Sequence, residues 1–210
     1  MRKEYDKIQD HVIVYTDAAC SGNGKENARA SMAMVFKKGS AWNQSKMISN
    51  IDRYSTARHI TNNPAEIIAI INALLFLLTK NMKKVELRTD SKWIVEYFEK
   101  YRDKRLREFQ AGMDCIKYKM NNQLLLNLEQ VCCKFEDLCI VHVKAHSESS
   151  FEGNILADEM ARSELEKTME KEQEHIDTLK DDNRMLNKNM EFNLNNLDLR
   201  LREIFGRKDH

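Results

Sequence analysis

HVIVYTDAACSGNG, residues 11–24, joins a strand-like run to a loop-like run around a single acid, Asp17. Residues 12–15 are rich in β-branched side chains, which favour a buried strand. The small residues 18–24 include two glycines, so we expect Asp17 to end the strand and a loop to follow. A carboxylate on rigid backbone beside a loop suits a metal or proton-transfer site. Asp also initiates turns for purely structural reasons, so this stretch alone leaves both interpretations open.

The composition predicts one domain, or one domain with an extension. The chain has 210 residues, of which 32% are charged and 42% hydrophobic. Its longest apolar stretch, residues 67–78, is interrupted by Asn72 and is too short to span a bilayer. Residues 1–10 have mixed charge and no apolar core, so we expect an intracellular protein of the nucleus or cytoplasm, not a secreted or membrane protein. The five cysteines form no C-x-x-C pair and are expected to be reduced.

Patterns along the chain predict an α/β fold. Residues 29–38 and 45–51 are expected to be strands of an antiparallel meander after the first strand. A long helix should follow, with Asn63 as N-cap, Pro64 as first helical residue and Glu66 placed for a capping box. The later expected elements are a strand at 84–89 ending before Asp90, a helix at 91–101, a helix at 122–135 with Cys132 and Cys133 in or near the core, a strand at 138–143, and a helix capped by Asn154.

Residues 100–119 combine basic and aromatic side chains. Seven Lys and Arg residues, among them Lys104, Arg105 and Arg107, are interspersed with Tyr101 and other rings. This pattern suits the phosphate backbone and sugar faces of a nucleic acid. A solvated amphipathic helix has a similar composition, so the pattern alone does not decide.

From Ser163 onward the sequence has no proline and no glycine before Gly206. Apolar residues recur at coiled-coil spacing between Glu- and Lys-rich flanks, with Asn183 in a seam position. So small a domain cannot bury a seam of this length, so we expect self-association as a homodimer. A solvated, frayed helix is the alternative. The apolar seam residues are Leu165, Met169, Ile176, Leu179, Leu186, Met190, Leu194, Leu197, Leu201 and Ile204.

Four carboxylates share one kind of position. Asp17 and Asp90 follow predicted strands, and Glu66 and Asp158 lie near predicted helix starts. Strand ends and helix starts converge at one edge in many α/β sheets, and clustered acids are costly unless cations neutralise them. Oxygen ligands favour Mg²⁺ or Mn²⁺ over zinc, and two such ions suit phosphodiester hydrolysis. His146, on a polar loop, is a candidate proton carrier.

Five ordered motifs resemble type 1 ribonuclease H: YTDAACSGNG, TNNPAE, RTDS, VKAHS and GNILADEMAR. The resemblance implies a five-stranded mixed sheet flanked by helices and Mg²⁺-dependent hydrolysis of the RNA strand of RNA–DNA hybrids. It covers a catalytic domain (12–163), which leaves an N-terminal segment (1–11) and the helical coiled coil (164–210) outside the family pattern. It also implies that Asp17, Glu66, Asp90 and Asp158 bind metal and that His146 assists proton transfer or product release.

The same resemblance implies contacts to each strand of the hybrid. Cys20, Asn23, Asn62 and Asn63 match positions that contact the RNA strand, where the 2′-hydroxyl distinguishes RNA from DNA. Positions implied for the DNA strand and its phosphates are His59, Thr61, Trp93, Lys104, Arg105, Arg107 and Asn121.

The sequence departs from the family pattern at several positions. Ala18 replaces a glycine, and His59 replaces an arginine of the phosphate pocket, which implies a weaker or pH-dependent grip on the DNA strand. Tyr101 and Arg105 stand near the places of the usual tryptophans, and the loop from His146 to Asp158 is two residues longer than usual. We expect no separate N-terminal hybrid-binding domain, and two catalytic domains in a dimer would restore affinity.

Three functions remain for comparison. An active ribonuclease H requires all four acids and the histidine, which are present. A catalytically weak hybrid-binding or scaffold protein would use the long helix to assemble partners. A DNA nuclease of related fold is less favoured, because it has no use for asparagines that contact 2′-hydroxyls.

Overall fold

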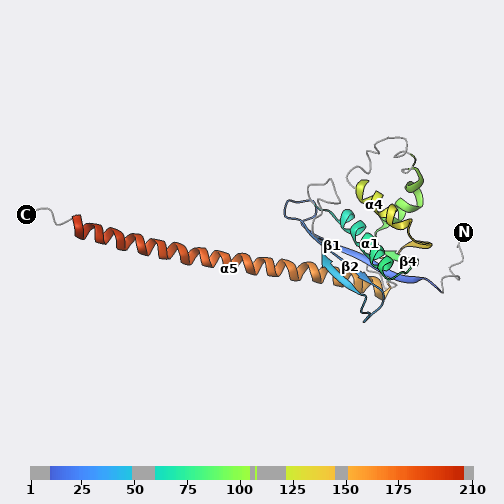
Figure 1. Ribbon diagram of the computed structural model, residues 1–210, viewed down its shortest axis with the longest axis horizontal. Coiled ribbons are helices and arrows are strands. Elements are labelled where there is room, and N and C mark those ends of the chain that lie inside the picture. Colours follow the sequence, from blue (N-terminus) through green and yellow to red (C-terminus); the bar gives the residue numbers. More distant parts are fainter. Residues whose placement is uncertain (1–9, 49–59, 105–106, 108–121, 145–150, 206–210) are drawn as a thin grey trace, which may run out of the picture. The chain divides into compact units, whose positions relative to one another are not determined.

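The computed structural model describes residues 10–48, 60–104, 107, 122–144 and 151–205 (Figure 1). A five-stranded mixed sheet has the order β3-β2-β1-β4-β5. The pairs β1–β2 and β2–β3 are antiparallel, whereas β1–β4 and β4–β5 are parallel. The mixed sheet predicted from the sequence is therefore confirmed. The strands are β1 (Val12–Ser21), β2 (Arg29–Val35), β3 (Gln44–Met47), β4 (Lys84–Thr89) and β5 (Asp137–His142).

One face of the sheet carries the main hydrophobic core. Side chains alternate between faces along a strand, so Val14 of β1 and Leu87 of β4 point to the same side. There they pack with buried residues of α1 (Asn62–Thr79) and α4 (Asn122–Cys132), which lie on this side in Figure 1. After β4, the short helix α2 (Lys92–Glu96) runs directly into a π-helical turn, η2 (Tyr97–Tyr101), which adds Tyr97 to this core.

Helix α1 is apolar because it is the central helix of this core. Within the described residues it alone has the length and hydropathy of a membrane span, and 56% of that window is buried inside the protein. Ile67, Ile70, Leu74 and Leu77 are fully enclosed by the sheet and α4. Its packing therefore accounts for its composition.

The other face of the sheet packs against the first turns of α5 (Glu152–Phe205). Tyr15 and Val35 form a small cluster with Ala157 of α5. Gly153 is essential to this approach, since a Cβ at this position would lie 2.3 Å from the Tyr15 ring. The hydroxyl of Ser31 also donates a hydrogen bond of 2.5 Å to the carbonyl of Ala161. These contacts fix the part of α5 that carries Asp158.

The chain divides into two compact units, residues 1–166 and 167–210. In the second unit, the helix continues to Phe205 and has large apolar side chains in contact with solvent. Their exposed fractions range from 40% at Met169 to 66% at Phe192. Leu165, by contrast, is buried in the first unit. The long C-terminal helix expected from the sequence is therefore present.

Several predicted boundaries are wrong. β1 does not end at Asp17 but continues to Ser21, because the small side chains of residues 18–21 permit pairing with β2, as far as Ser21 opposite Arg29. The N-cap of α1 is Thr61, without a side-chain hydrogen bond, so Asn63 and Pro64 lie inside the first turn.

Corrections at the other elements are smaller. Asn154 is not a cap: α5 begins at Glu152, and the Asn154 amide donates to the carbonyl of Phe151. Cys133 is exposed rather than close to the core, because α4 ends one residue earlier. The second and third strands end at Val35 and Met47, and the helix expected at 91–101 is divided between α2 and η2.

Candidate active site

Asp17 lies in the middle of β1, opposite Ala33 of β2. It shares a face of the strand with Tyr15, and only 8% of its surface is exposed. Burial raises its pKa to about 8, and the nearby carboxylates of Asp90, Asp158 and Glu66 contribute to the increase. A 2.7 Å hydrogen bond from the amide of Ala18 to Oδ1 partly opposes this effect. The backbone therefore holds a carboxyl group where negative charge is disfavoured.

Glu66 reaches the same region from the first turns of α1. Its Oε2 accepts a hydrogen bond from the hydroxyl of Ser91, so the side chain does not form the expected capping box. Burial raises the pKa of Glu66; the Ser91 bond lowers it, and the charge of Asp90 raises it. Ser91 is itself buried, and its amide donates to Oγ1 of Thr89. The end of β4 thus orients the carboxylate of α1.

Asp90 and Asp158 complete the acidic group. Asp90 directly follows β4, whose parallel neighbour β1 carries Asp17. Asp158 lies on α5 and accepts a hydrogen bond from Arg162, one helical turn later. Both acids act electrostatically on Asp17. Two strands and two helices therefore bring four carboxylates together, although the acids are up to 141 positions apart in the sequence.

The donor set fits a hard divalent cation, because it consists of carboxylate oxygens alone. The electrostatic cost at Asp17 is the kind that a bound cation would relieve. Within the described ranges, no three His, Cys, Asp or Glu side chains are arranged to hold a metal ion directly. Three of the acids are instead turned toward protein donors, namely the Ala18 amide, Ser91 and Arg162. Each of these hydrogen bonds uses one of the two oxygens of its carboxylate.

The predicted RNA-contacting residues come from two neighbouring segments. Oδ1 of Asn23 accepts a 3.1 Å hydrogen bond from the amide of Asn62, and the amide of Gly24 donates to the carbonyl of Ile60. The turn after β1 needs left-handed backbone at Gly22 and Gly24, with φ of 64° and 75°. These contacts join the turn to the start of α1, where Asn62 and Asn63 are exposed.

Other predicted residues are less closely associated. Cys20, in β1, is half-buried with Ala30 and Ile60, and burial raises the pKa of its thiol. Thr61 precedes α1, and Trp93 packs on the core with its ring 6.4 Å from that of Tyr97. Lys104 and Arg107 are exposed. His59, Arg105, Asn121 and His146 lie outside the described residues.

Two partner residues were not identified as functional from the sequence. Ser91 donates a hydrogen bond to the carboxylate of Glu66, and Arg162 donates one to the carboxylate of Asp158. The four-residue spacing from Asp158 to Arg162 on a predicted helix is a signal that was available. The Ser91–Glu66 contact had no such signal, because it links two elements 25 residues apart.

The sheet order and the carboxylate group together define a ribonuclease H-like fold. The family model described as RNase H matches residues 9–166, and the chain therefore belongs to the RNase H family. Among its relatives, Ribonuclease H of Ehrlichia canis is 31% identical over 171 residues, covering 80% of this chain and 100% of that protein.

Other relatives extend this comparison. Ribonuclease H1 of Homo sapiens is 29% identical over 164 residues, which are 77% of this chain and 52% of the human protein. The chain thus spans about half the length of its mammalian relatives. The crystal structure of LC11-RNase H1 in complex with an RNA/DNA hybrid has a TM-score of 0.53 at 24% identity, covering 75% of this chain and 98% of that chain. This similarity shows the shared fold.

Proposed function

We propose that this chain is an endonuclease that hydrolyses the RNA strand of RNA–DNA hybrids. The observation that carries the proposal is the convergence of Asp17, Glu66, Asp90 and Asp158, three of which raise the pKa of the fourth. A protein that only binds nucleic acid gains nothing from this group, since clustered negative charge repels phosphates. Membership of the RNase H family and the hybrid-bound structural neighbour support the choice of substrate.

The proposed cofactor is Mg²⁺, as two ions, with Mn²⁺ as an alternative. Asp17, Glu66, Asp90 and Asp158 would hold it. When bound, divalent ions neutralise the carboxylates, activate water and stabilise the leaving oxygen of a phosphodiester. In this proposal Ser91 keeps Glu66 oriented toward the site. His146 would assist proton transfer or product release.

The asparagine pair on the turn after β1 and the start of α1 is proposed to read the RNA strand. The backbone amide of Asn62 donates a hydrogen bond to the side-chain oxygen of Asn23, which fixes the two segments relative to each other. The side chains of Asn23, Asn62 and Asn63 end in amide groups, which can both donate and accept hydrogen bonds. Such groups suit a 2′-hydroxyl, which does the same. The DNA strand is assigned to Thr61, Trp93, Lys104 and Arg107, together with His59, Arg105 and Asn121.

We further propose homodimerisation through residues 164–210, in an intracellular protein of the nucleus or cytoplasm. The exposed apolar side chains of the second unit support self-association, since a second helix would remove them from water. Asn183 would face its counterpart across a two-stranded coiled coil, which satisfies its amide only if the helices are in register.

Cleavage of matched substrates tests the proposed activity. The same sequence is presented as an RNA–DNA hybrid, duplex RNA and duplex DNA, each with Mg²⁺ or with EDTA. We expect cutting of the hybrid's RNA strand alone, and only with Mg²⁺. Tight hybrid binding without cutting would instead favour the scaffold function, and cutting of duplex DNA would favour a DNA nuclease.

A further inference from the structure

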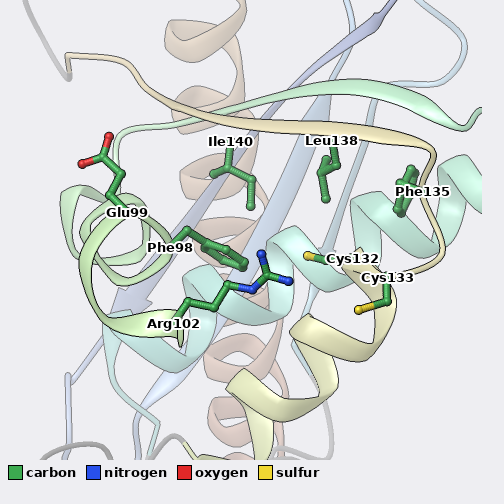
Figure 2. A pocket seen from close by; sticks show the side chains of 8 residues that line it. All are labelled: Phe98, Glu99, Arg102, Cys132, Cys133, Phe135, Leu138 and Ile140. Atoms are coloured by element: carbon green, nitrogen blue, oxygen red, sulfur yellow. The ribbon is translucent and has the colours of Figure 1, made fainter. Parts of the chain in front are cut away.

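A cavity of about 350 Å³ lies on the core side of the sheet (Figure 2). None of the four acids of the candidate active site lines it. Its walls come from η2 and the residue after it, from the end of α4 and the segment that follows α4, and from the edge strand β5. Cavities of this size commonly hold small organic molecules. The lining residues are Phe98, Glu99, Arg102, Cys132, Cys133, Phe135, Leu138 and Ile140.

Arg102 places a positive charge in this cavity. Figure 2 shows its guanidinium group between Phe98 and Cys132. It lies 5.8 Å from the centre of the Phe98 ring. Its Nε is buried and has no hydrogen-bond partner in the described part of the chain. A buried donor without an acceptor is unfavourable, so this atom indicates a missing partner.

The surrounding side chains do not supply that partner. Burial raises the pKa of the Cys132 thiol to about 12, so this group stays neutral despite the nearby Arg102. The carboxylate of Glu99 is directed away from the guanidinium in Figure 2. The remaining walls are aromatic and aliphatic, from Phe98, Phe135, Leu138 and Ile140. The lining therefore combines one guanidinium group and the Glu99 carboxylate with a largely apolar surface, and the buried Glu129 also acts on Cys132.

We propose that this cavity binds a small organic monoanion, with a carboxylate on Arg102 and an apolar body between Phe98, Phe135 and the two β5 side chains. Guanidinium groups recognise carboxylates by paired hydrogen bonds. A single cation balances a single negative charge, so a dianionic phosphate would remain partly uncompensated beside Glu99. The aromatic walls favour an aryl group over a sugar.

Titration of the full chain with 3-phenylpropionate tests this assignment, and 3-phenylpropionamide is the neutral control of the same shape. Methyl NMR signals of Leu138 and Ile140 report where each compound binds. We expect both signals to move on saturation, with the carboxylate binding about tenfold tighter than the amide. Arg102→Met should remove this preference, whereas Lys134→Met, a charge deletion near the cavity but outside its lining, should retain it. Ile140→Phe, which narrows the cavity, should weaken the binding of both compounds.

Three outcomes would overturn the proposal. They are equal affinity of acid and amide, preference for the acid retained in Arg102→Met, and no saturable shift of the β5 methyl signals up to about 10 mM ligand. If Arg102→Met does not fold, the proposal is still tested by comparing the affinities for the acid and the amide in the unmodified chain and in Ile140→Phe. None of these measurements depends on nuclease activity.

Discussion

The two units of the chain differ in how far their charged and apolar side chains are buried. In the first unit, the buried Glu86 is paired with Arg88, whose Nε lies 2.5 Å from Oε1 of Glu86 and whose Nη1 donates to the Tyr15 hydroxyl at 2.6 Å. In the second, the Arg184–Asp181 pair is exposed, and the apolar side chains around it, such as Leu186, also face solvent. The first unit therefore encloses a hydrophobic core, whereas the second leaves its large apolar side chains in contact with solvent.

In the proposed function, chemistry belongs to the first unit and association to the second. A buried carboxylate changes its proton affinity and can serve a reaction, as at Asp17, where the pKa rises. An exposed charge on a long helix is screened by water and contributes little. Removing groups from each unit should therefore affect different measurements.

The largest effect is expected from Asp17→Asn. Removing this carboxylate should lower hybrid cleavage by about 10³-fold or more, if the four acids act as one metal-binding group. Asp177→Asn, an exposed change on the second unit's helix, is the matched control and should leave the cleavage rate unchanged. Full cleavage by Asp17→Asn would refute the proposed site.

The same variant should be more stable than the parent in the absence of metal. The folded-state pKa of Asp17 is raised from 3.8 to about 8, so the folded protein binds this proton more tightly than the unfolded chain. Its contribution to stability is thus present at low pH and is lost as the pH rises between these values. Urea unfolding at pH 4 should show little difference, whereas at pH 8 the variant should gain at least about 1 kcal/mol. An equal difference at both pH values would contradict the burial of a charged Asp17.

The second effect concerns stability and compares two arginines. Arg88→Met leaves Glu86 buried without its partner and breaks contacts to Tyr15 and Phe151, so the free energy of unfolding should fall by about 3 kcal/mol. Arg184→Met breaks an exposed pair, so no measurable change is expected. Chemical denaturation measures both, and similar losses would erase the distinction between the units.

A third, smaller effect is expected at Ser91. Ser91→Ala removes the donor that orients Glu66, and loss of such an orienting contact typically costs about 10–100-fold in metal affinity or activity. The Mn²⁺ concentration giving half of the maximal thermal shift should rise accordingly. Thr178→Ala is the control, because it deletes an exposed hydroxyl that donates to the Glu174 carbonyl within the helix of the second unit. An unchanged metal midpoint in Ser91→Ala would show that Glu66 needs no such support.

The smallest expected effect is a twofold decrease in the mass of the assembly when the proposed dimer dissociates. Replacing Leu179 and Leu186 by Lys places charges on the exposed apolar surface of the second unit, so the proposed dimer should become a monomer in sedimentation equilibrium. Cleavage at saturating hybrid should be retained per domain. The matched control, Lys180→Glu with Lys188→Glu, changes charge without changing the apolar surface and should preserve the dimer. A parent chain that is already monomeric would refute the dimer proposal.

The sequence predicted the architecture well because the acids stand beside elements with clear patterns. β4 was predicted with its observed bounds, and α1 and α4 follow strong apolar periodicity. β1 was predicted too short, because Ala18, Ala19 and Cys20 have weak strand preference and are held in the sheet by pairing with β2. Such long-range pairing is absent from local sequence patterns.

The sequence predicted that these four acids converge, but it did not predict the residues that position them. Ser91 contacts Glu66, and Gly153 packs on the Tyr15 ring, only after distant segments meet. The cavity around Arg102 has the same origin, since its walls come from residues 98–102 and 132–140. Arg102 belongs to the basic stretch 100–119 that suits a nucleic acid, yet its side chain lines this cavity, with its guanidinium group between Phe98 and Cys132 in Figure 2.

Cleavage of a labelled RNA–DNA hybrid by the full chain and by Asp90→Asn, with Mg²⁺, is the most direct test of the central claim. The four-carboxylate account predicts metal-dependent cutting of the RNA strand by the parent chain and none by the variant, with hybrid binding retained because the variant carries less negative charge beside the phosphates. Equal cutting by both proteins, or cutting that persists in EDTA, would contradict it.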